Sequence, residues 1–312
     1  MAGMRAAAAV LALAACTASP PPEEAPRLAV DAGWPTIPAG AKFGEVSAVD
    51  VDAAGNVFVL HRAGRVWEEP FPADPIAEPT VFKFAPDGTL LARWGAGVFV
   101  MPHGISVDPA GKVWITDVGR EQVFRFSAEG AQELVIGTRG VGGRDAAHFG
   151  RPADVAFLGE RVLVADGYVN TRVAEFDRQG RFLREWGDFA VAHAVAADDR
   201  RVYVADRENA RIQVFDHAGT LLESRASAAG NHTYSLKPLG GGRLVAVEGR
   251  DAADRKRAII RIYARDGTIE GSFDVGLPGR DASLGHDVAL GLDGKVYVTD
   301  VPGGRVVRFS IP

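Results

Sequence analysis

The segments Val113-Trp-Ile-Thr-Asp117 and Val202-Tyr-Val-Ala-Asp206 share one pattern, an apolar strand that ends in an acidic residue. Six segments of the 312-residue chain follow it, the first with histidine in place of the acid: 57–61, 113–117, 162–166, 202–206, 244–248 and 296–300. A second apolar strand follows each, at 81–84, 123–126, 173–176, 212–215, 260–263 and 306–309. Short strands and glycine turns that recur about every 40 to 50 residues are typical of β-propeller blades. The sequence therefore predicts an all-β fold, a six-bladed β-propeller formed by residues 27–312.

The last predicted blade leaves no room for its outermost strand before Pro312. Residues 27–31 (Arg-Leu-Ala-Val-Asp) precede the first blade and have no other partner in this scheme. We expect this N-terminal segment to supply the missing strand of the sixth blade, because closure of the ring removes an open sheet edge.

The N-terminal residues resemble a bacterial lipoprotein signal peptide. Arg5 precedes an apolar run, and Leu13-Ala14-Ala15-Cys16 resembles a lipobox, which predicts a signal peptide over residues 1–15. Cys16 is the single cysteine, so no intrachain disulfide can form. We expect a lipid on Cys16, a proline-rich tether over 16–26, and a lipid-anchored protein of the bacterial cell envelope, at the outer membrane or the periplasmic face. The alternative is an ordinary secretory signal with an incidental cysteine.

The charge balance argues against nucleic acid as a partner. The chain has 35 basic and 40 acidic residues, a net charge of −5, and no basic run. Neither a phosphate-binding glycine loop nor a Gly-x-Ser-x-Gly motif occurs, which disfavours nucleotide binding and serine hydrolysis. We expect a monomer.

Histidine occurs at one place of the repeat in every second copy: His103, His193 and His286. The innermost strand of each blade lines the central channel of a propeller, so these three side chains should converge. Three imidazoles with a free fourth position predict a catalytic zinc site. The alternative is that these histidines are structural, hydrogen-bonded residues that bind no metal. Other residues are expected at this place in the remaining blades: Ser47 or Ala48, Ala153, and His232 or Thr233.

A second set of candidates lies just beyond the strand ends. Arg62 and Arg207 directly follow the strand-end residues of blades one and four, and Tyr168 follows Gly167 in blade three. An arginine pair can bind a carboxylate and can lower the pKa of a tyrosine, which makes the tyrosine a usable base. For each arginine alone, a strand-end ion pair is the alternative. The recurring acids at the strand ends are expected to be structural.

Three segments closely resemble a known family: Met101-Pro-His-Gly-Ile-Ser-Val-Asp108, Ala165-Asp-Gly-Tyr-Val-Asn-Thr-Arg172 and Ala205-Asp-Arg-Glu-Asn-Ala-Arg-Ile-Gln213. They resemble the lyase domain of peptidylglycine α-amidating enzyme, that is, the peptidyl-α-hydroxyglycine α-amidating lyases, which are six-bladed propellers akin to NHL-repeat proteins. The resemblance covers residues 46–309. It implies zinc on the three histidines, Tyr168 as the general base, and Arg62 and Arg207 as active-site arginines. It also implies a structural calcium ion held by the backbone carbonyls of Val49 and Ile105 and the carboxylate of Asp287.

The implied reaction cleaves an N-acyl- or peptidyl-α-hydroxyglycine to a primary amide and glyoxylate. Two residues depart from the family pattern, Leu284 in place of a frequent methionine and Gly285 in place of a proline. No copper monooxygenase domain is present, so the substrate could be a small hydroxyglycine derivative. Two other functions stay open. One is an NHL-type propeller lipoprotein that binds peptides or envelope partners around a structural metal, and the other is a metal-dependent hydrolase such as a lactonase, although lactonases usually use carboxylate and amide ligands.

Overall fold

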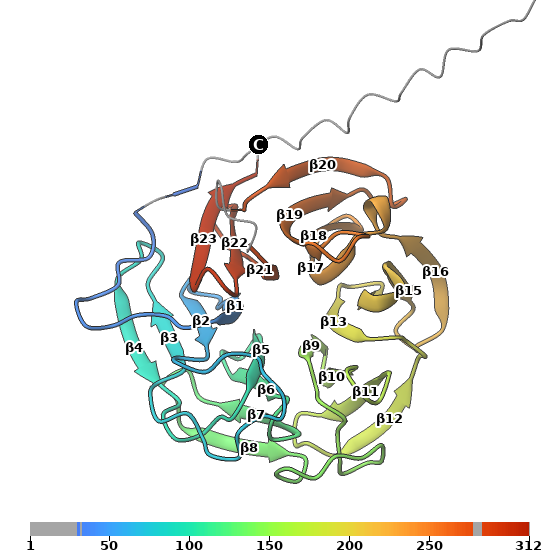
Figure 1. Ribbon diagram of the computed structural model, residues 1–312. Coiled ribbons are helices and arrows are strands. Elements are labelled where there is room, and N and C mark those ends of the chain that lie inside the picture. Colours follow the sequence, from blue (N-terminus) through green and yellow to red (C-terminus); the bar gives the residue numbers. More distant parts are fainter. Residues whose placement is uncertain (1–29, 32, 277–282, 312) are drawn as a thin grey trace, which may run out of the picture.

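The computed structural model describes residues 30–31, 33–276 and 283–311. Six antiparallel sheets follow one another around a common axis, as in a propeller (Figure 1). The only helical segments of this described part are two short 3-10 turns, η1 (Arg207–Asn209) and η2 (Ala228–Gly230). The predicted all-β, six-bladed β-propeller is therefore confirmed.

Each blade runs outward from the axis in chain order. Blade one contains β1 (Val46–Val51), β2 (Val57–His61), β3 (Val81–Phe84) and β4 (Leu90–Trp94). Blade two contains β5 (Pro102–Val107), β6 (Val113–Asp117), β7 (Gln122–Phe126) and β8 (Gln132–Ile136). Blade three contains β9 (Asp154–Leu158), β10 (Arg161–Asp166), β11 (Arg172–Asp177) and β12 (Phe182–Trp186). Blade four contains β13 (Ala192–Ala197), β14 (Val202–Asp206), β15 (Arg211–Phe215) and β16 (Leu221–Ala226).

The last two blades complete the ring. Blade five contains β17 (His232–Gly240), β18 (Arg243–Arg250), β19 (Lys256–Tyr263) and β20 (Ile269–Asp274). The described part of blade six contains β21 (Gly285–Leu290), β22 (Lys295–Asp300) and β23 (Arg305–Ser310). The predicted strand-end segments coincide with the second strand of each blade.

Burial explains why the second strand of each blade is the easiest to recognise from the sequence. Every residue of β2, β6 and β14 is buried, because both faces of the blade pack against neighbouring blades. A strand buried on both faces has a continuous apolar sequence rather than an alternating one. The outermost strands β4 and β12 instead alternate between partly buried and exposed residues.

The chain near Asp31 lies against the last strand of blade six. The Asp31 amide donates a hydrogen bond to the Arg308 carbonyl on β23 over 2.8 Å, and the Asp31 carboxylate forms an ion pair with the Arg308 guanidinium. This contact agrees with an N-terminal segment beside β23. The rest of the expected closing strand, residues 27–29, lies outside the described residues, as do the expected signal peptide, Cys16 and the tether. Among the described residues, no helix has the length and hydrophobicity needed to cross a membrane.

A bulge in the innermost strand marks the site in each histidine blade. The pairing register shifts between Pro102 and Ile105 in β5, between Ala192 and Ala194 in β13, and between Gly285 and Val288 in β21. A bulge adds an unpaired residue and re-aims its side chain. The three histidines lie within these irregular stretches, so the same local device turns each imidazole toward the axis.

Candidate active site and metal centre

The three repeat histidines meet on the propeller axis. Their ligand atoms all lie within 4.8 Å of one another, and all three side chains are buried. The ring centroids are 4.7 to 5.0 Å apart. Within the described part of the chain, this is the one group of three or more His, Cys, Asp or Glu side chains placed to share a metal ion.

Each histidine is oriented by the blade that follows its own. The Nδ1 atoms of His103, His193 and His286 donate hydrogen bonds to the carbonyls of Ala153 (2.8 Å), Tyr234 (2.6 Å) and Ser47 (2.7 Å). A carbonyl can only accept, so each Nδ1 carries the proton and each Nε2 has a lone pair with which it could bind a metal. Burial is the main reason that the pKa of each imidazole lies far below 6.5, for His286 at about 3, and nearby arginines lower it further. Neutral imidazoles with Nε2 lone pairs fit a zinc ion.

These carbonyls also identify the repeat position in the other blades. Ser47 and Ala153 hold it in blades one and three, as expected. For blade five, the expectation of His232 or Thr233 is wrong, because Tyr234 holds the position. Two register shifts in β17, one on each side of Thr233, displace the chain there, and counting from neighbouring repeats cannot reveal them.

The Tyr168 hydroxyl lies against two of the three histidines on the axis. It is 3.0 Å from Nε2 of His103 and 3.1 Å from Nε2 of His193. Arg207 Nη1 donates a hydrogen bond of 3.1 Å to the same hydroxyl. The ring packs against Trp67, with centroids 5.4 Å apart. The tyrosine oxygen therefore lies beside both the Nε2 atoms of two histidines and a guanidinium.

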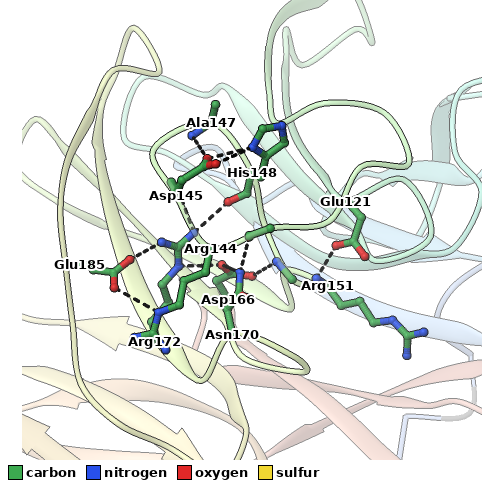
Figure 2. Close-up of polar contacts among 12 residues, drawn as sticks. Glu121, Arg144, Asp145, Ala147, His148, Arg151, Asp166, Asn170, Arg172 and Glu185 are labelled. Carbon is green, nitrogen blue, oxygen red and sulfur yellow. Dashed lines mark hydrogen bonds and ion pairs between the residues drawn. The ribbon is translucent and has the colours of Figure 1, made fainter.

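A polar network surrounds Asp166 and Arg172, the residues on either side of the loop that contains Tyr168 (Figure 2 shows the network). Asp166, at the end of β10, accepts hydrogen bonds from the Gly150 amide (2.7 Å), Asn170 Nδ2 (2.7 Å) and Arg172 Nε (2.8 Å). Arg172 also donates to the His148 carbonyl over 2.8 Å and pairs with Glu185. The side chains of both Asp166 and Arg172 are fully buried. The loop over 167–171 is thus fixed at both ends, which sets the position of the tyrosine.

The other strand-end acids also accept hydrogen bonds that hold neighbouring loops in place. Asp117, for example, accepts hydrogen bonds from the backbone amides of Val100 (2.6 Å) and Met101 (3.0 Å) in the loop before β5. Asp206 accepts one from the Ala190 amide, and Asp300 one from the Leu284 amide. Each acid ties its strand to the loop that leads into the innermost strand of the same blade.

The two candidate arginines have different partners. Arg62 is 2% exposed; its Nε donates to the Pro102 carbonyl (3.1 Å), its Nη1 pairs with Glu45 (2.8 Å), and its Nη2 is buried without a partner. Arg207 donates through Nε to Glu208 (2.7 Å) and through Nη1 to Tyr168. Burial alone would lower the pKa of Arg207, but the oxygens of Tyr168, Tyr234 and Glu208 outweigh it and raise that pKa. Arg207 thus donates a hydrogen bond to Tyr168, whereas Arg62 retains one donor, Nη2, that has no acceptor.

All three predicted catalytic residues and His286 line one cavity of about 260 Å³. Its walls are Arg62, Trp67, Tyr168, Arg207, Glu208, Tyr234, Arg250, Leu284, His286 and Val301. The sequence analysis missed the four further charged or aromatic residues among these: Trp67, Glu208, Tyr234 and Arg250. A signal existed for two of them, because Glu208 and Arg250 lie two residues beyond their strand-end acids, as Tyr168 does in blade three.

Comparisons with known proteins agree with this architecture. The NHL repeat family matches residues 99–126 and 189–215. The probable peptidyl-α-hydroxyglycine α-amidating lyase of Caenorhabditis elegans is 30% identical over 302 residues, which cover 86% of this chain and 83% of that protein. The chain belongs to the peptidyl-α-hydroxyglycine α-amidating lyase family. It is accordingly an enzyme of the lyase class.

Other relatives of the lyase are longer or more distant. Peptidyl-glycine α-amidating monooxygenase B of Xenopus laevis is 32% identical in an alignment of 313 positions, which covers 90% of this chain and 35% of that protein. The chain thus spans about a third of the length of that relative. A solved structure of a gluconolactonase from Xanthomonas campestris superposes with a TM-score of 0.63 over 87% of each chain, at 15% identity, and shares the fold alone.

Next to the histidines, carboxylate and carbonyl oxygen atoms face the central channel. Asp287 Oδ2 accepts a hydrogen bond of 2.9 Å from the Val49 amide, so the Val49 carbonyl faces the channel as well. The Val107 amide donates to Asp50 Oδ2 over 2.7 Å. The Ile105 carbonyl, two residues earlier on the same strand, therefore points the same way. The Val49 and Ile105 carbonyls and the Asp287 carboxylate are oxygen donors of the kind that calcium prefers.

The charges around this donor set also suit a divalent cation. Asp154 directly follows the repeat position of blade three, as Asp287 does in blade six, and the sequence analysis missed it. Burial raises the pKa of Asp154 to about 7. Burial alone would lower the pKa of Lys237, but the field of Asp50, Asp154 and Asp287 raises it. Burial raises the pKa of Asp287 as well, and a bound divalent cation would favour the ionised forms of both carboxyl groups. Three carboxyl groups therefore face a single ammonium group, and their oxygen atoms fit a calcium ion.

Proposed function

We propose that this protein is a zinc-dependent lyase that cleaves N-acyl- or peptidyl-α-hydroxyglycine to a primary amide and glyoxylate. The observation that carries the proposal is the Tyr168 hydroxyl, placed between the Nε2 atoms of two metal-type histidines and Nη1 of Arg207. The names of the relatives, which describe amidating lyases of peptidyl-α-hydroxyglycine, support the same reaction.

The Nε2 atoms of His103, His193 and His286 would hold the zinc ion, which when bound supplies a Lewis acid that acidifies the substrate hydroxyl. The carbonyls that hold the Nδ1 atoms fix each ring before any ion arrives. Such outer contacts orient metal ligands and raise their basicity. The chain thus contributes three pre-oriented imidazole ligands, which would leave a fourth position of a tetrahedral zinc ion to the substrate oxygen.

Tyr168 is the general base in this proposal. Its oxygen takes the proton of the substrate hydroxyl as the carbinol carbon becomes the aldehyde carbon of glyoxylate and its bond to nitrogen breaks. The electron pair of that bond goes to the departing amide nitrogen, which takes up a proton, so the reaction is balanced without a redox cofactor. Arg207 Nη1 donates to the tyrosine oxygen and stabilises its negative charge before proton transfer.

Arg62 holds the substrate carboxylate in this proposal. Its Nη2 is buried and unpartnered, and Arg62 lines the same cavity as Tyr168 and His286. A buried unpaired donor is costly, and a carboxylate would satisfy it by a charge-assisted hydrogen bond. The remaining contacts to Pro102 and Glu45 keep the guanidinium fixed.

Calcium has a structural role in this proposal. The carbonyls of Val49 and Ile105 and the carboxylate of Asp287 would hold it below the zinc position. Because Asp287 directly follows the ligand His286, an ion bound there would brace that metal ligand.

The cavity of about 260 Å³ suits a hydroxyglycine head group with a small acyl group or the last residue of a peptide. We further propose that the mature chain is a monomer, is lipid-anchored at Cys16, and acts in the bacterial cell envelope. A binding module with a structural metal is the rival function.

Glyoxylate release from α-hydroxyhippurate tests the proposed function. The purified protein should release glyoxylate, lose activity on chelation and regain it with zinc. A zinc-loaded protein that is inert on every hydroxyglycine tried, but binds peptides, would favour the binding module.

A further inference from the structure

Glu208 joins two arginines at the edge of the active-site cavity. Its Oε1 accepts hydrogen bonds from Arg207 Nε over 2.7 Å and from Arg250 Nη2 over 2.5 Å. Its Oε2 lies 3.5 Å from His232 Nδ1. One carboxylate oxygen is therefore shared by the arginine that contacts Tyr168 and by a second arginine from the next blade.

The Arg207 guanidinium lies beside two aromatic rings. Its Cζ is 5.0 Å from the Tyr168 ring centroid and 4.9 Å from the Tyr234 ring centroid. Such cation–π contacts are attractive but do not set the direction in which Nη1 points. The hydrogen bond from Nε to Glu208 does set it, because the five donors of a guanidinium form a rigid fork, so that fixing Nε also fixes Nη1.

Arg250 holds Glu208 from the opposite side. Its Nη1 donates to Asp254 over 2.5 Å, and its Cζ lies 5.6 Å from the Tyr234 ring centroid. Glu208 is 34% exposed and would be free to turn toward solvent without these contacts. Arg250 thus contacts Glu208, Glu208 contacts Arg207, and Arg207 contacts Tyr168.

The sign of the charge rules out direct electrostatic help from Glu208. A carboxylate near Tyr168 opposes the negative charge that develops on the tyrosine oxygen. Any benefit from Glu208 must therefore come from the orientation that it gives Arg207. We propose that Glu208 is a positioning residue that aims Arg207 Nη1 at the Tyr168 hydroxyl, and that Arg250 holds Glu208 in place. This inference rests on the proposed function.

A double-mutant cycle tests it. Glu208→Ala should lower kcat by about 10- to 100-fold, the range found when outer contacts of a site are removed, with KM changed by less than about threefold. In an Arg207→Ala background, Glu208→Ala should add less than about a twofold loss, because its target is gone. Glu208→Gln keeps an oxygen acceptor and should recover most of the lost kcat. Glu270→Ala is the matched control and should leave kcat unchanged, since Glu270 is 39% exposed, pairs with Arg243 and does not line the cavity.

Three results would each overturn the proposal. The first is a loss of kcat from Glu208→Ala that is as large in the Arg207→Ala background as in the wild type. The others are a loss confined to KM, and a Glu208→Gln variant as slow as Glu208→Ala. A crystal structure of Glu208→Ala gives a readout independent of turnover. Arg207 should no longer donate to the Tyr168 hydroxyl in it, and an unchanged hydrogen bond would refute the positioning role. This readout holds even if the wild-type protein proves inert on hydroxyglycines, a result that would count against the proposed function instead.

Discussion

Replacing Arg172 by methionine should strongly destabilise the protein. Both Arg172 and its partner Asp166 are fully buried. The change leaves the Asp166 carboxylate with only its contacts to Gly150 and Asn170, and removes the donors to the His148 and Asp145 carbonyls. Loss of one partner of a buried ion pair costs about 3 to 5 kcal/mol, because the other charge stays buried. We expect the free energy of unfolding to fall by about that amount.

Urea unfolding followed by tryptophan fluorescence and circular dichroism measures this change, provided that the two transitions coincide. Arg181→Met is the matched control. Arg181 also pairs with an aspartate, Asp177, but is 78% exposed, so its loss should cost less than about 1 kcal/mol. A cost for Arg172→Met as small as that for Arg181→Met would refute our view that the buried pair anchors the Tyr168 loop.

Three further predictions concern metal ions and location. Replacing His103, His193 or His286 by alanine should lower zinc affinity at least about tenfold, whereas His148→Ala should not. A full complement of zinc in the triple variant, measured by elemental analysis, would reject the site. Lys237→Met removes a positive charge near the expected calcium and should raise calcium affinity at least about tenfold by calorimetry, a reading unconnected with turnover; unchanged or weaker affinity would contradict the charge argument. Cys16→Ser should move the protein from the membrane fraction to the soluble fraction and abolish fatty-acid labelling, and unchanged fractionation would count against the lipid anchor.

The fold was largely predictable because the second strand of each blade is buried on both faces. Such a strand must be apolar along its whole length, as in Val113–Asp117, and its repetition gives the number of blades. The three histidines were predictable for the same reason, since one position of a repeat maps to one place around an axis.

The rest of the site depends on features that repeat position does not encode. Tyr234 was missed because irregular pairing in β17 shifts the register of blade five. Trp67 was missed because it lies in the irregular connection between β2 and β3, far from any repeat position. Arg172 contacts residues up to 27 positions away in the chain, and only the folded loops bring them together.

The central claim is that Tyr168 acts as the base beside the zinc ion, and Tyr168→Phe tests it most directly. The change removes one hydroxyl and little volume, so folding and zinc content should persist. The kcat on α-hydroxyhippurate should fall by about two to four orders of magnitude, the usual range for loss of a general base. A zinc-loaded Tyr168→Phe enzyme with near-normal turnover would contradict the account.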